Sequence, residues 1–114
     1  MSETIVYYDE NYPSSWIWDE SAKILSGYYK NKGMDRKGAE ELEGWIEEKI
    51  EEDASSSAVI FAQDIVPDTI LRMNSPNDLI RKYLDKGGRI IWIGDIPFWT
   101  KGFRSDLKNI FSFY

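Results

Sequence analysis

The sequence predicts an α/β domain with a parallel sheet, and three observations support this fold class. Two apolar runs, Ala58 to Ala62 and Ile90 to Ile93, show no polar alternation, which is typical of strands buried on both faces. A segment with helical spacing lies between them. Strand, helix, strand in this order requires a right-handed crossover, so the two strands run parallel. At 114 residues, the chain is expected to form a single domain, residues 1–114.

The first part of the chain predicts a strand, a helix and a weak second strand. Residues 4–8 are β-rich and end at a turn-forming loop. A helix is expected from about residue 15 to residue 31, because its apolar positions recur at helical spacing and Gly33 supplies a stop. Residues 34–38 are charged on both faces, so they predict a short edge strand or a loop.

The second part of the chain completes the sheet. Residues 39–52 show an apolar stripe opposite a glutamate-rich, solvated face, which predicts a second helix. A third helix is expected to begin at the Ser75-Pro76 cap and to stop at Gly87-Gly88. The predicted architecture is a three-layer sandwich with a flavodoxin- or Rossmann-like parallel sheet of about four strands in the order 2-1-3-4. The apolar C-terminal segment, residues 96–114, is expected to cover the edge of the fourth strand.

Composition excludes several classes of function. The net charge of −6 and the lack of a basic cluster argue against nucleic acid as a partner. The apolar runs are far shorter than a membrane span, and no signal-peptide pattern begins the chain, so neither a membrane nor an export role is expected. The chain contains neither cysteine nor histidine, which fits a cytoplasmic location. Abundant Glu, Lys, Ile and Tyr with a single Gln suggests a thermophilic source.

The stretch from Ala58 to Asp95, with its helix ending in Lys86-Gly87-Gly88-Arg89 before an apolar strand, resembles class I glutamine amidotransferase-like domains. The trehalose-utilisation (ThuA-like) branch is the most similar, and the opening Ile5 to Asp9 resembles the family's first unit. The resemblance implies the doubly wound fold. It also implies a nucleophilic cysteine at the turn Gly94-Asp95-Ile96-Pro97, where this chain has no thiol. The chain would therefore be a degenerate, truncated member without amidotransferase catalysis.

Acidic residues follow three of the predicted strands. Asp9, Gln63-Asp64 and Asp95 stand at carboxyl ends, which meet at one edge of a parallel sheet. Asp9, Asp64 and Asp95 are therefore candidate ligands of Mg²⁺ in a metal-dependent hydrolase or phosphotransferase. The alternative is that these aspartates cap loop or helix N–H groups. No other cofactor is expected.

Aromatic residues flank two of the same loops, and they suggest a ligand-binding role. Such rings could stack a sugar or a nucleobase beside the acids, although packing in the core or at an interface is the simpler interpretation. The candidate ligand-binding residues are Asp9, Tyr12, Trp16, Gln63, Asp64, Asp95, Phe98 and Trp99.

These patterns favour a non-catalytic binding or assembly module over an enzyme. The predicted fourth strand is apolar on both faces and carries no charge or proline to protect its edge. The C-terminal segment contains more aromatic residues than are needed to cover one strand edge. A homodimer with its interface in the segment from Phe98 to Tyr114 is therefore expected, and a different protein partner is the alternative.

Overall fold

The computed structural model describes residues 3–12, 19–72, 75–93, 100–103 and 106–109. The helices are α1 (Asp19–Asn31), α2 (Ala39–Glu51) and α3 (Leu79–Asp85), with a 3-10 turn η1 at Ala54–Ser56. The strands are β1 (Glu3–Tyr7), β2 (Arg36–Lys37), β3 (Ser57–Phe61), β4 (Val66–Pro67), β5 (Arg89–Trp92), β6 (Thr100–Phe103) and β7 (Asp106–Asn109).

Four of these strands form a parallel sheet in the order β2-β1-β3-β5. Ile5 of β1 is aligned with Val59 of β3, and Ile60 of β3 is aligned with Ile91 of β5. The predicted α/β fold class is confirmed. The predicted strand order is also confirmed, because the strand expected as the fourth is β5, and β4 lies in a different sheet.

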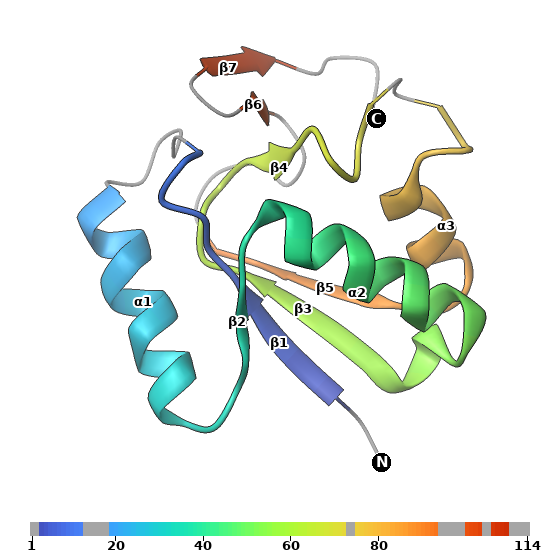
Figure 1. Ribbon diagram of the computed structural model, residues 1–114, viewed down its shortest axis with the longest axis horizontal. Helices are drawn as coiled ribbons and strands as arrows, with labels where there is room; N and C mark the ends of the chain where they lie inside the picture. The colour runs from blue at the N-terminus through green and yellow to red at the C-terminus, as the bar shows by residue number, and fades with distance from the viewer. Residues whose placement is uncertain (1–2, 13–18, 73–74, 94–99, 104–105, 110–114) are drawn as a thin grey trace.

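The helices cover the two faces of this sheet in three layers (Figure 1). Side chains alternate along a strand, so Ile5 and Val59 pack on the face covered by α2 and α3, whereas Val6 and Ile60 pack on the face covered by α1. The two central strands are thus buried on both faces, as their continuous apolar sequence predicts.

The two edges of the sheet differ in how they are protected. β2 is two residues long and consists of Arg36 and Lys37, so it is a short, charged edge strand. The opposite edge is β5, which is longer and apolar, and among the described strands it pairs only with β3.

The outer strand β5 is less buried than the two central strands, although its sequence is apolar on both faces. Ile91 is 46% exposed. It shares a face with Ile93, which packs in the α1-side cluster, whereas α1 makes its main contacts with β1 and β2.

A second sheet of three strands, in the order β4-β6-β7, was not predicted. β4 pairs in parallel with β6, and β6 pairs antiparallel with β7. The described backbone of the C-terminal segment therefore pairs with the segment after β3 rather than with β5. The side chains expected to cover the β5 edge lie outside the described residues.

The third helix begins later than expected. The cap was predicted at Ser75, but α3 starts at Leu79 and is preceded by a turn. The Asp78 carboxylate holds this turn, because it accepts hydrogen bonds from the backbone N–H groups of Arg72 (2.8 Å) and Ser75 (2.9 Å). A side chain that bonds backward in this way favours a turn over a helix across residues 75–78.

The other helices agree more closely with the sequence pattern. α2 buries Leu42, Trp45 and Ile46 of the predicted apolar stripe. α1 ends as predicted at Asn31, and residues 15–18 of its expected first turn lie outside the described residues. Within the described part of the chain, no helix has the length and apolar character needed to cross a membrane.

Candidate functional site

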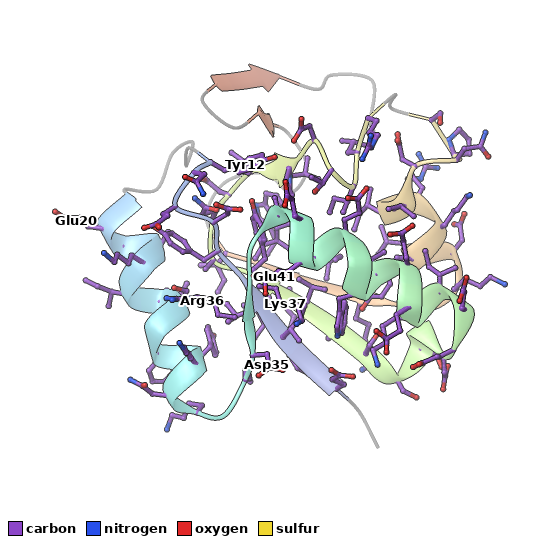
Figure 2. All side chains as sticks on the ribbon, in the orientation of Figure 1. Tyr12, Glu20, Asp35, Arg36, Lys37 and Glu41 are labelled. Atoms are coloured by element: carbon purple, nitrogen blue, oxygen red, sulfur yellow. The ribbon has the colours of Figure 1, made fainter. Side chains whose placement is uncertain are left out.

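The carboxyl end of the parallel sheet, where the sequence predicts a ligand site, carries a hollow of ≈ 260 Å³ beside the N-terminus of α2. In Figure 2, Tyr12 lies at this end of the sheet, whereas Asp35 lies near the amino end of β2. The lining residues are Asp9, Asn11, Tyr12, Gly38, Glu40 and Glu41. Three of these are acidic and none is basic, so the hollow disfavours phosphate and other anionic groups.

Asp9 follows β1 directly, and both of its carboxylate oxygens bind backbone groups. Oδ1 accepts a hydrogen bond from the Asn11 N–H (2.9 Å), and Oδ2 accepts one from the Ala39 N–H (2.8 Å). Ala39 is the first residue of α2, so Asp9 supplies the helix cap that Gly38, which has no side chain, cannot supply. A Cβ atom on Gly38 would lie 2.8 Å from Asp9 Oδ2, so the glycine leaves room for this cap. For Asp9, the geometry favours the capping interpretation.

Gln63 lies fully buried just after β3, and it holds the loop that follows β1. Its Oε1 accepts a hydrogen bond from the Asp9 N–H (2.9 Å). Its Nε2 donates to the carbonyl oxygens of Asp9 (3.0 Å) and Tyr12 (2.9 Å). The side-chain amide thus bonds to three backbone groups, of which the Asp9 carbonyl also accepts a hydrogen bond from the Tyr12 N–H (3.0 Å). In the described geometry, Gln63 organises the site rather than facing it.

Tyr12 lines the hollow but is itself mostly buried, with 9% of its surface exposed. Its hydroxyl donates a hydrogen bond to Asp68 Oδ1 (2.7 Å). Burial, and then this bond to Asp68, raise the pKa of the Tyr12 hydroxyl above its ordinary value. The ring therefore joins the loop after β1 to the segment after β4. The other aromatic candidates, Trp16, Phe98 and Trp99, lie outside the described residues, so the stacking hypothesis stays a prediction.

The predicted metal ligands are only partly within the described chain. Asp64 is buried, with 1% of its surface exposed. Asp95 lies outside the described residues. Across residues 3–12, 19–72 and 75–93, no group of three or more acidic, histidine or cysteine side chains is arranged to hold a metal ion. The three-carboxylate site is therefore untested by the described residues, and it stands as the alternative to the capping interpretation.

Sequence reasoning missed two residues of this site. Asp68 is not among the predicted site residues, although it anchors Tyr12. Gly38 was expected only in an edge strand or loop. Glu41, three residues later, accepts a hydrogen bond from the Gly38 N–H (3.2 Å), and this spacing was the available signal for a helix start at residue 38.

The role of Asp9 can be tested by two substitutions. Asp9→Ala is expected to lower the free energy of unfolding by about 2 kcal/mol, because it removes both backbone acceptors, and Asp9→Asn by about 1 kcal/mol, because it keeps one. Urea unfolding measures both. Millimolar Mg²⁺ is expected to leave the melting temperature of each protein unchanged. A rise in the wild type that Asp9→Asn abolishes would instead identify Asp9 as a metal ligand.

Comparison with known proteins identifies the family of the chain and a curated relative. The sequence model of the MJECL34 family matches residues 2–110. A curated protein from Methanocaldococcus jannaschii, described as uncharacterized protein MJECL34, is 38% identical over 95 residues. The alignment covers 81% of this chain and 32% of the relative, so the chain spans about a third of that relative's length. No solved structure matches the chain.

These matches overturn the resemblance to glutamine amidotransferase-like and trehalose-utilisation domains. The family found is a different one. The residues that carried the resemblance, a helix ending in Gly87-Gly88 before an apolar strand, reflect the doubly wound architecture, which unrelated families share. They predict the fold and carry no information about the family.

Proposed function

The chain belongs to the MJECL34 family, and we propose that it acts there as a non-catalytic module that assembles with a second copy of itself. The observation that carries this proposal is the unequal protection of the two sheet edges. β2 is short and charged. Such a strand is expected at a sheet edge that does not pair with another chain. β5 has an apolar sequence from Ile90 onward and no protecting charge beyond Arg89 at its start.

The polar groups at the carboxyl end of the sheet also favour assembly over catalysis. Asp9 and Gln63 are the central polar side chains there, and both bond to backbone groups that they hold in place. A catalytic acid or base needs to reach a substrate proton. The hydrogen bonds to the backbone instead hold the side chains of Asp9 and Gln63 in place. The sequence contains no cysteine to act as a thiolate nucleophile and no histidine, the commonest general base.

Two further expectations accompany this proposal. A cytoplasmic location fits a chain that needs no disulfide. An interface through the aromatic segment from Phe98 to Tyr114 is an alternative mode of self-association, and its side chains lie outside the described residues.

The proposal is tested by sedimentation equilibrium of the purified full chain from micromolar to sub-millimolar concentration. A two-fold assembly is expected, so the weight-average mass should rise toward twice that of the chain. A mass that stays at the monomer value over the whole range would overturn the proposal.

A further inference from the structure

We infer that the outer face of α1 is a self-association surface, on which α1 of a second copy packs antiparallel about a two-fold axis between Ile24 and Tyr28. This inference rests on the proposed self-assembly and names a surface for it. The surface is distinct from the edge of β5 and from the C-terminal segment, and substitutions can tell the three apart.

The first argument is an apolar pair on the outer face of α1. Ile24 is 74% exposed and Tyr28 is 53% exposed, and they lie four residues apart, about one turn along the helix. The face toward the sheet is built from other residues, of which Ala22 and Ser26 are fully buried. Neither Ile24 nor Tyr28 belongs to the described core clusters. Helix propensity does not explain them either, because isoleucine and tyrosine are weaker helix formers than lysine or glutamate.

The second argument is that opposite charges lie at the two ends of this pair. A row at i, i+4 spacing along the outer face consists of Glu20, Ile24, Tyr28 and Lys32. The row is complementary to itself in the antiparallel direction, because Glu20 of one copy then faces Lys32 of the second. Ile24 likewise faces Tyr28 of the second copy. Neither Glu20 nor Lys32 forms an ion pair with another described residue of its own chain. In Figure 2, Glu20 extends away from the sheet at the start of α1.

The third argument is the packing geometry. Rows at i, i+4 spacing are the ridges that interlock in the commonest class of helix pair, with axes crossing at about 50° and lying about 8–10 Å apart. The neighbouring row consists of Lys23, Gly27 and Asn31, and an added Cβ atom at Gly27 would meet no atom within 4 Å. The glycine at the centre of that row leaves a groove beside Ile24 and Tyr28. The ridge of the second copy fits into this groove.

The fourth argument is that the Tyr28 side chain is already held in place. Its ring lies edge-to-face with the Tyr29 ring, with centroids 5.3 Å apart. The Lys32 ammonium lies over the Tyr28 ring, 5.3 Å from its centroid. A side chain that is ordered before association loses less entropy when it enters an interface. The same contact holds Lys32 beside the apolar pair, where Glu20 of the second copy would meet it.

The charge of α2 excludes the equivalent pairing through that helix. α2 carries six glutamates and one lysine, a net charge of −5, whereas α1 carries two acidic residues and two lysines and is neutral. A face of like charges repels its own copy. The two helices lie on opposite faces of the sheet (Figure 1). Two copies can therefore approach through α1 while the acidic faces of both α2 helices point away from the contact.

The size of this contact predicts its strength. α1 has 13 residues and is therefore about 20 Å long. A crossing of two such helices is smaller than a standard interface, which buries about 800 Å² on each partner. We therefore expect a weak dimer that dissociates at micromolar concentration or above. Sedimentation from micromolar to sub-millimolar concentration spans this range.

Reversal of the two charges tests the pairing. Glu20→Lys places lysines opposite each other at both ends of the contact, and Lys32→Glu places glutamates there. Each single variant is expected to weaken dimerisation about 10-fold or more, because attractive pairs become repulsive ones. The double variant Glu20→Lys/Lys32→Glu restores opposite charges, and its dissociation constant is expected to return to within about 3-fold of the wild type. The two positions are about 18 Å apart along the helix axis, so this recovery cannot arise within one chain.

Ile24→Lys tests the apolar centre of the contact, and Ile91→Lys is the matched control. Both positions are exposed isoleucines, but Ile91 lies on β5 and is 46% exposed. Ile24→Lys is expected to weaken dimerisation about 100-fold, because each dimer loses two contacts between an isoleucine and Tyr28. Ile91→Lys is expected to leave dimerisation unchanged. Circular dichroism melts compare the folding of every variant with that of the wild type.

A cross-linking experiment gives a second readout that does not depend on weakening the dimer. The chain contains no cysteine, so Ile24→Cys and Tyr28→Cys each introduce a single thiol. In the antiparallel pair, position 24 of one copy faces position 28 of the other. Mild oxidation of an equal mixture of the two variants is therefore expected to give more covalent dimer on a non-reducing gel than either variant gives alone at the same total concentration.

The outcomes separate the inference from the proposed function. A wild-type dimer that neither Ile24→Lys nor the charge reversals weaken, with no preferred cross-link in the mixture, would overturn pairing through α1 and leave self-assembly through another surface standing. Single charge reversals that weaken the dimer, without recovery in the double variant, would overturn the antiparallel register. A dimer weakened by Ile91→Lys but not by Ile24→Lys would place the contact at β5 instead. A wild-type monomer over the whole concentration range would overturn both the inference and the proposed function.

Discussion

Gly88→Ala is expected to lower the free energy of unfolding by about 3 kcal/mol or more, which would be a large fraction of the stability of a small domain. A Cβ atom at this position would lie within 3.0 Å of the Tyr83 ring, closer than real Cβ atoms approach. The ring cannot easily move away. It is fully buried, it packs against Trp45, and its hydroxyl shares a hydrogen bond of 2.8 Å with Ser57 Oγ.

Gly44→Ala is the matched control for this substitution. Gly44 lies in the middle of α2 on an exposed turn, and no atom lies within 4 Å of where its Cβ would be. Alanine there is expected to raise the free energy of unfolding by about 0.5–1 kcal/mol, through helix propensity alone. Urea unfolding of both variants measures the contrast. A Gly88→Ala protein as stable as the wild type would show that Tyr83 is not fixed as described.

Gln63→Leu is expected to lower the free energy of unfolding by about 4 kcal/mol, although leucine and glutamine have similar volumes. The substitution leaves the Asp9 N–H and the Tyr12 carbonyl without the partner that Gln63 provides, and each such group costs about 1–3 kcal/mol. The Asp9 carbonyl loses one of its two donors and keeps the Tyr12 N–H (3.0 Å). The loop after β1 should also lose its conformation, which the rate of hydrogen exchange across residues 8–12 would report. Unchanged exchange there would contradict the role assigned to Gln63.

Gln63→Glu refines this test through its pH dependence. The carboxylate keeps an acceptor for the Asp9 N–H, but it cannot donate to the two carbonyl groups, so at neutral pH the variant is expected to be strongly destabilised. Burial would raise the pKa of the introduced glutamate in the folded state. The stability relative to wild type should therefore be highest below the unfolded-state pKa and fall as pH rises through the folded-state pKa. A difference from wild type that does not change with pH would contradict this account.

The parallel sheet could be predicted from the sequence, because its two longest apolar runs are continuous and separated by a helical segment. Even the edge strand at Arg36 was placed correctly, since residues charged on both faces can lie only at an edge. The second sheet could not be predicted. β4 consists of Val66 and Pro67, and two residues carry no periodic pattern. The start of α3 was misplaced, because Ser75-Pro76 has the composition of a helix cap and Asp78 instead bonds backward to form a turn.

The location of the site could be predicted from the sequence, but the roles of its residues could be predicted only in part. Asp9, Tyr12 and Gln63 follow strands, and the structure brings all three to one loop. Their bonding could not be anticipated, because the partners are distant in sequence. Ala39 is 30 residues from Asp9, and Gln63 is 51 residues from Tyr12. A single sequence contains no local signal for such pairs.

The cap that Asp9 provides to α2 has a consequence for the order of folding. Most helices carry their cap within the same turn, so their first hydrogen bonds can form in an isolated segment. The cap of α2 comes instead from the end of β1, and it is in place only when β1 lies beside β2. Closing that loop of about 30 residues costs entropy before the cap can form. The amino-terminal turn of α2 should therefore become stable only after the first two strands have paired. The formation of this turn thus follows the pairing of β1 with β2.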